Sequence, residues 1–141
     1  MTVLESQINT ALSYAAGMRP KVGGFPYLAE VLRQTGVTRI LVNVPGMTTT
    51  FVTPEGSVVQ QGEPQVTGAI EMAPFDAAAL IAALRADQAG LSSYPEFMAA
   101  TWAAGVLTYD VDLNERTCTY RSPASEAYTE AYAVVEVPAI A

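Results

Sequence analysis

The chain has 141 residues, of which half are hydrophobic and 15% are charged, and its formal net charge is −7 at pH 7. A chain of this length can bury a core without the help of a disulfide or a metal ion. Its seven basic residues are scattered, so they form no stripe that would neutralise phosphates or an anionic lipid surface. We expect a single domain over residues 1–141, and we exclude nucleic acid and membranes as partners.

The sequence contains no histidine and a single cysteine, Cys118. Without histidine, every Ser–His or Cys–His nucleophile pair is excluded, and so is a tetrahedral zinc site. One cysteine forms no internal disulfide, and on the inner face of a strand we expect it to be inert. We therefore expect no cofactor, and an enzyme of this sequence would have to use carboxylates and tyrosines, with or without Mg²⁺.

The first residues, Met-Thr-Val-Leu-Glu, lack the basic and apolar regions of a signal peptide. The longest apolar runs are far shorter than the ~20 residues that span a bilayer. We expect a soluble protein of the cytoplasm.

Two helices are predicted at the start of the chain. Thr2 and Glu5 have the spacing of a capping box, and apolar residues recur every three to four positions until about Ala16. Pro26 is typical of the first turn of a second helix, which Gly36 ends.

From residue 38 the apolar period changes to two, which predicts a strand over residues 38–44. Pro45-Gly46 then forms a turn, Met47 to Thr53 is a return strand, and Val58-Val59 is a short third strand. The polar segment 60–68 connects the two halves of the chain.

The second half repeats this order of elements. A helix is predicted from Pro74 to Leu84, and another begins at Pro95. Two strands, Leu107 to Leu113 and Arg116 to Arg121, form a hairpin, and a last strand runs from about Ala127 to Val137. In the first of these helices we expect the inward residues to be Ala77, Leu80, Ile81 and Leu84.

Sliding the chain by 69 residues aligns residues 25–54 with residues 94–123 without a gap. The identical pairs include Pro26 with Pro95, Gly36 with Gly105 and Thr50 with Thr119. We interpret residues 1–60 and 70–141 as copies of one helix–helix–hairpin unit. The predicted fold is α+β, with two layers: one antiparallel sheet that joins both hairpins, and about four helices on its inner side.

The second hairpin carries a candidate binding pair. Its short turn places Tyr109 opposite Tyr120 on the core face, so Asp110 and Asp112 share the other face. Two carboxylates there could hold Mg²⁺ or Ca²⁺ with water. The alternative is a solvated sheet face, where polar residues are ordinary; we predict no metal.

Tyr128 and Tyr132, on the last predicted strand, are a second candidate for binding. Tyrosine offers an apolar ring and a polar hydroxyl to a ligand. If the halves are duplicated, we expect a functional cleft at the seam between them, where such tyrosines can converge.

The segment from Gly105 to Tyr120, with Asp110, Asp112 and the run Thr-Cys-Thr-Tyr, resembles the YbcV-like family, as does the closing Val-Glu-Val-Pro. This is a family of small bacterial and prophage proteins without an assigned function, some labelled "phage envelope protein". The resemblance implies an α+β domain and assigns no site residues.

These patterns favour a non-enzymatic binding or interaction module. The alternatives are the carboxylate and tyrosine enzyme and a sensor domain for a small ligand. We also expect a homodimer, because charged residues are few and the last strand has only Glu130 and Glu136 to protect its edge from pairing.

Overall fold

The computed structural model describes residues 1–140, so position 141 of the expected domain lies outside the described residues. The four helices and six strands confirm the predicted α+β fold. Within the described residues, no helix combines the length and the apolar character needed to cross a bilayer. In chain order the elements are α1 (Val3–Met18), α2 (Phe25–Thr35), β1 (Arg39–Asn43), β2 (Thr48–Thr53), β3 (Gly56–Gln61), α3 (Ala77–Gln88), α4 (Tyr94–Ala103), β4 (Thr108–Asp112), β5 (Thr117–Arg121) and β6 (Ala127–Ala131).

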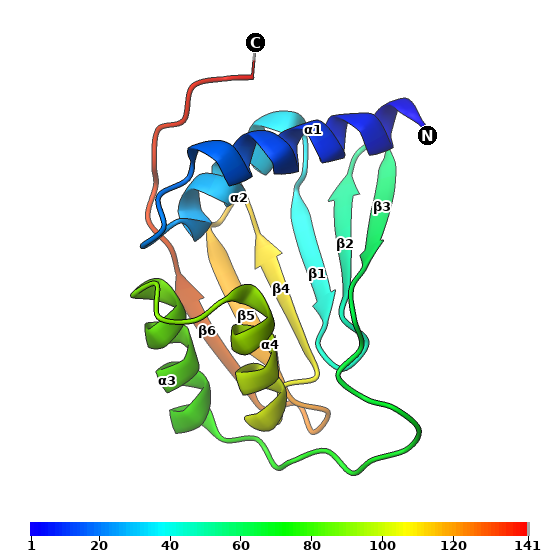
Figure 1. The fold of residues 1–141 in the computed structure, drawn as a ribbon, viewed down its shortest axis with the longest axis vertical. Helices are drawn as coiled ribbons and strands as arrows, with labels where there is room; N and C mark the ends of the chain where they lie inside the picture. Colours follow the sequence, from blue (N-terminus) through cyan, green and yellow to red (C-terminus); the bar gives the residue numbers. More distant parts are fainter. Residues whose placement is uncertain (141) are drawn as a thin grey trace.

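The six strands form one antiparallel sheet in the order β3-β2-β1-β4-β5-β6. The two hairpins therefore meet at β1 and β4, where Leu41 pairs with Asp110. Figure 1 shows the helices layered on the sheet, with α1 lying across the strands at one end and α3 and α4 running along them. The single sheet with its helices on the inner side is the predicted arrangement.

The helix starts follow from their capping residues. The backbone N–H of Thr2 donates to Glu5 Oε2 at 2.9 Å, and the N–H of Glu5 donates to Thr2 Oγ1 at 3.1 Å, which confirms the predicted capping box. The prediction for α3 was wrong by three residues: Asp76 caps it, so the helix begins at Ala77 rather than Pro74. Ala77 is then exposed in the first turn instead of facing the core.

The core lies between the helices and one face of the sheet. Ile40 and Val42 of β1 and Val111 of β4 are buried there, together with Leu32 and Leu80 from the helices. Tyr109 pairs with Tyr120, as the hairpin spacing predicts. Since side chains alternate along a strand, Asp110 and Asp112 point to the face without helices.

The last strand is shorter than predicted, because β6 ends at Ala131 rather than Val137. Beyond it, the chain leaves the sheet edge and runs past α2 and α1 (Figure 1). The side-chain amide of Gln34 donates to the carbonyl of Val137 at 3.1 Å, and the Tyr14 hydroxyl donates to that of Pro138 at 2.9 Å. These bonds to helix side chains replace strand pairing. The homodimer stays a prediction.

Candidate functional site

The predicted aspartate pair already has partners within the protein. Asp110 accepts a hydrogen bond from Arg39 at 2.9 Å. Asp112 Oδ1 accepts the backbone N–H groups of Asn114 and Glu115, both at 3.0 Å. Among residues 1–140, no group of three or more His, Cys, Asp or Glu is arranged to hold a metal ion. Charge pairing and turn formation therefore account for both carboxylates, and their binding role stays a prediction.

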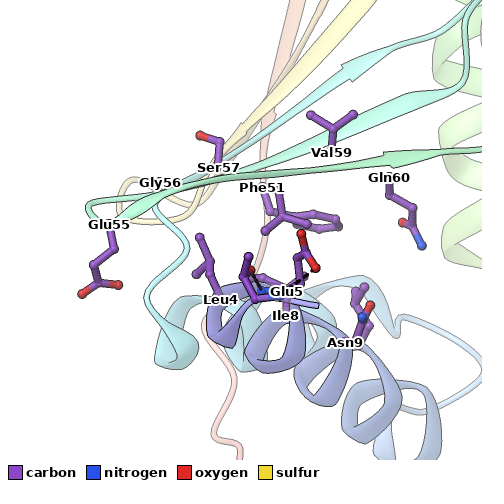
Figure 2. A pocket seen from close by; sticks show the side chains of 13 residues that line it. Leu4, Glu5, Ile8, Asn9, Phe51, Glu55, Gly56, Ser57, Val59 and Gln60 are labelled. Carbon is purple, nitrogen blue, oxygen red and sulfur yellow. Dashed lines mark hydrogen bonds between the residues drawn. The ribbon is translucent and has the colours of Figure 1, made fainter.

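One hollow, of about 570 Å³, lies between α1 and the strands β2 and β3; we call it the α1–β3 groove. Figure 2 shows Ile8 and Phe51 facing each other across it, while Ser57 and Val59 point away from the helix. The carboxylate of Glu5, which also lines it, is engaged in the capping box of α1. The groove therefore offers an apolar floor, one carboxylate engaged in a helix cap and a second, Glu55, at the exposed turn between β2 and β3.

A second cavity, of about 330 Å³, lies where the two halves meet; we call it the chamber. Its walls are the start of α2, the helices α3 and α4, and the strands β4 to β6. Ligand pockets range from about 300 to 1,000 Å³, so the chamber suits a small molecule. Its lining side chains are Phe25, Pro26, Leu84, Asp87, Gln88, Phe97, Tyr109, Cys118, Tyr120, Glu130, Ala131, Tyr132 and Ala133, with the backbone of Gly23 and Gly24.

The strand register and the helix starts bring aromatic rings together in the chamber. Tyr109 and Tyr120, neighbours across β4 and β5, have ring centroids 5.0 Å apart. Phe25, the first residue of α2, meets Tyr132 edge to face, with centroids 5.3 Å apart and planes at 81°. The Tyr94 hydroxyl lies 3.4 Å from that of Tyr109. Contacts between rings of this kind favour a defined cavity shape over collapse.

Glu130 forms one wall of the chamber and is fully engaged. Its carboxylate accepts hydrogen bonds from Gln88 at 2.6 Å, from Tyr128 at 2.8 Å and from Arg85 at 3.1 Å. Burial raises the pKa of this carboxyl, but the three donors outweigh burial and leave the pKa below its usual value. Glu130 is therefore ionised at neutral pH, and it ties α3 to the edge strand β6.

Asp87, near the end of α3, is the contrasting carboxyl. Within residues 1–140 its side chain receives no hydrogen bond and forms no ion pair. Burial raises its pKa, and the more distant Arg19 lowers it only in part. Asp87 also lines an adjoining hollow of about 620 Å³, which Arg19 and Lys21 border. The unpartnered carboxyl therefore lies between the chamber and this adjoining hollow, which is more open and which we call the vestibule.

The hydroxyls and the thiol of the chamber are neutral at pH 7. Burial raises the pKa of Cys118 and that of Tyr132 to about 12. It also raises the pKa values of Tyr109 and Tyr120 above the usual value for tyrosine. The tyrosines can donate or accept hydrogen bonds, but neither they nor Cys118 are activated as nucleophiles.

Of the predicted tyrosines, Tyr132 lines the chamber, while Tyr128 lies beside it and bonds to Glu130. The structure does not bring the aspartate pair to this site, because Asp110 and Asp112 lie on the opposite face of the sheet. Sequence reasoning missed Asp87, which lies outside the segments that the 69-residue offset aligns.

Comparison with known proteins places most of this architecture within one family. Residues 18–130 match the model of a family described as "Protein of unknown function (DUF1398)". Relatives include the uncharacterized proteins Rv2012 of Mycobacterium tuberculosis and Mb2035 of Mycobacterium bovis. Each is 51% identical over 118 residues, which are 84% of this chain and 72% of the relative. The matched family region contains the chamber-lining residues up to Glu130 but not Ala131, Tyr132 and Ala133, and it contains only the last residue of α1, which borders the α1–β3 groove.

Proposed function

The chain belongs to the DUF1398 family, and we propose that it is a binding module that takes a small molecule with an apolar body into the chamber. The observation that carries this proposal is the unpartnered carboxyl of Asp87 in the wall of an aromatic cavity. Asp87 is half-buried, and a carboxylate held partly out of water without a partner is unfavourable, so its presence in this wall favours a role toward a ligand. The rings around it supply apolar contact area.

The surroundings of the chamber support binding to a preformed site. Glu130 and its three donors fix α3 against β6, and the backbone N–H of Gly23 donates to the carbonyl of Gln88 at 3.2 Å, which links the helix loops of the two halves. A cavity held open in this way avoids the ordering cost that a flexible site must meet on binding.

Binding is favoured over catalysis by the protonation states of the lining residues. A nucleophile or general base needs a pKa near the working pH, whereas burial raises those of Cys118 and Tyr132 to about 12. Asp87 alone among the lining residues is a free carboxyl, and no activated nucleophile stands beside it.

A fragment screen followed by ¹H–¹⁵N NMR tests the proposal. We expect aromatic fragments to shift the amide signals of Gly23, Cys118 and Tyr132, and we expect Tyr132→Ala to weaken their binding about tenfold or more. Gln60→Ala, in the α1–β3 groove, is the matched control and should leave binding unchanged. Fragments that shift only groove residues, or that bind a folded Tyr132→Ala variant as tightly as the parent, would refute the assignment of the site.

A further inference from the structure

We propose that the ligand of the chamber is an organic cation, an ammonium group on an aromatic or similarly apolar body. This inference rests on the proposed function and adds the charge of the ligand. It follows from the charges and rings of the cavity wall.

The charged side chains that line the chamber are all negative. Among the described residues that line the chamber there are two carboxyls, Asp87 and Glu130, and no lysine or arginine. Arg85 balances Glu130, at 3.1 Å, from outside the lining. Among the described residues no cation forms an ion pair with Asp87, on which Arg19 acts only from the vestibule. A ligand that fills the chamber would remove water from this carboxylate, which is unfavourable unless the ligand brings a positive charge or a donor.

Five rings line the chamber: Phe25, Phe97, Tyr109, Tyr120 and Tyr132. Aromatic rings carry partial negative charge on their faces and attract ammonium groups placed over them. The neutral tyrosine hydroxyls add hydrogen-bond acceptors. Rings and an unpartnered carboxylate together favour a cation over a neutral molecule of the same shape.

The positive side chains near the site, Arg19 and Lys21, border the vestibule and not the chamber. An anionic group entering the chamber would meet Asp87 without a compensating cation. It would also meet Glu130, whose donors are already used. Anions are therefore expected to be excluded from the chamber.

Three probes share a phenylethyl group and differ in charge, so they distinguish a cationic, a neutral and an anionic ligand: 2-phenylethylammonium, 2-phenylethanol and 3-phenylpropionate. Affinities are measured by calorimetry at pH 7 with the full chain and with Asp87→Asn. We expect the ammonium probe to bind at least tenfold tighter than the alcohol and the carboxylate to bind weakest. Asp87→Asn should remove the preference for the cation and leave the affinity for the alcohol unchanged. Glu71→Gln removes the same charge from the exposed connector and should change neither.

The outcomes distinguish the two proposals. If the alcohol or the carboxylate binds in the chamber as tightly as the ammonium probe, the cation inference is wrong and the binding function stands. If Glu71→Gln weakens the ammonium probe as much as Asp87→Asn, the preference comes from net charge and the inference is equally wrong. If the three probes and the fragment library all fail to shift chamber residues, both proposals fall.

Discussion

The two halves of the molecule share an order of helices and strands but differ in the hollow beside their outer helix: the α1–β3 groove lies within the first half, whereas the chamber lies in the second half with one wall from the start of α2. Both have the order helix, helix and three strands, and in both a glycine with positive φ follows the second helix, Gly36 at 109° and Gly105 at 81°. Met47 and Arg116 also share a positive φ, and they too are 69 residues apart. These agreements favour the predicted duplication, which stays an inference.

The difference lies in the outer helix and in a few side chains. In the first half α1 lies across the strands and leaves the α1–β3 groove, whereas in the second half α3 runs along them and closes the chamber (Figure 1). At matched positions on the second strand of each hairpin, the first half has Phe51 and the second has Tyr120. The order of elements is thus the same in both halves, whereas the residues that line the two hollows differ.

The largest expected effect comes from the matched glycines. A Cβ on Gly105 would lie 2.5 Å from the carbonyl oxygen of Pro74 and 2.7 Å from the Cα of Phe75, whereas a Cβ on Gly36 would meet nothing within 4 Å. The left-handed conformation costs alanine about 1–2 kcal/mol at either site, and overpacking adds about 1–3 kcal/mol at Gly105. Gly105→Ala should therefore lower the free energy of unfolding by about 2–5 kcal/mol, measured in urea.

Gly36→Ala is the control for this comparison, and it should cost only about 1–2 kcal/mol. Equal losses of unfolding free energy for the two variants would show that residues 74–75 move away from the added Cβ at little cost. The halves would then be less different in packing than the structure indicates.

A smaller effect on the free energy of unfolding is expected at Glu30. This residue has no counterpart in the second half, because the 69-residue offset aligns it with Ala99. Glu30 is buried and accepts two hydrogen bonds from Arg33, at 2.8 and 2.7 Å. These bonds hold its pKa below the usual 4.5. The stability they confer is complete above pH 4.5 and is lost as the pH falls through the lowered pKa of the folded state.

Glu30→Gln should therefore be less stable than the parent by about 1–2 kcal/mol at pH 7, since Arg33 is partly exposed and screened by solvent. The difference should shrink as the pH is lowered toward 3, in urea titrations across that range. Glu63→Gln, in the exposed connector, should show no such dependence. A difference that stays constant with pH would mean that packing, and not the charge of Glu30, is responsible.

The order of helices and strands and the hairpin register could be predicted from the sequence better than the residues that line the chamber. Hairpin register follows from turn length and alternation, so Tyr109 opposite Tyr120 could be read from local pattern. The extent of β6 could not, because the chain after Ala131 is held by Gln34 and Tyr14, which lie far away in the sequence. The lack of a hydrogen-bond partner for Asp87 could not be predicted either, because it depends on where side chains far away in the sequence lie in the fold.

The last comparison is between Asn43 and Asp112, which end matched strands on the face without helices. The Asn43 side-chain oxygen accepts the backbone N–H of Gly46 at 2.8 Å, and Asp112 accepts that of Glu115 at 3.0 Å. The acceptors and the donors are both 69 residues apart. A neutral amide thus does in the first half what the carboxylate does in the second, which favours a turn-forming role for Asp112.

Asp112→Asn should accordingly change the free energy of unfolding by less than about 0.5 kcal/mol, because the side-chain oxygen that accepts the turn hydrogen bonds is kept.

Millimolar Mg²⁺ or Ca²⁺ should leave the melting temperature of the parent protein unchanged. A metal bound only by the native state, at 100 times its Kd, would add about 2.7 kcal/mol, and about 2–4 °C in melting temperature accompany each kcal/mol in a domain of this size. A rise in melting temperature on that scale would establish a cation site if it were abolished in the variant that combines Asp110→Asn and Asp112→Asn. The turns at Asn43 and Asp112 would then not be equivalent.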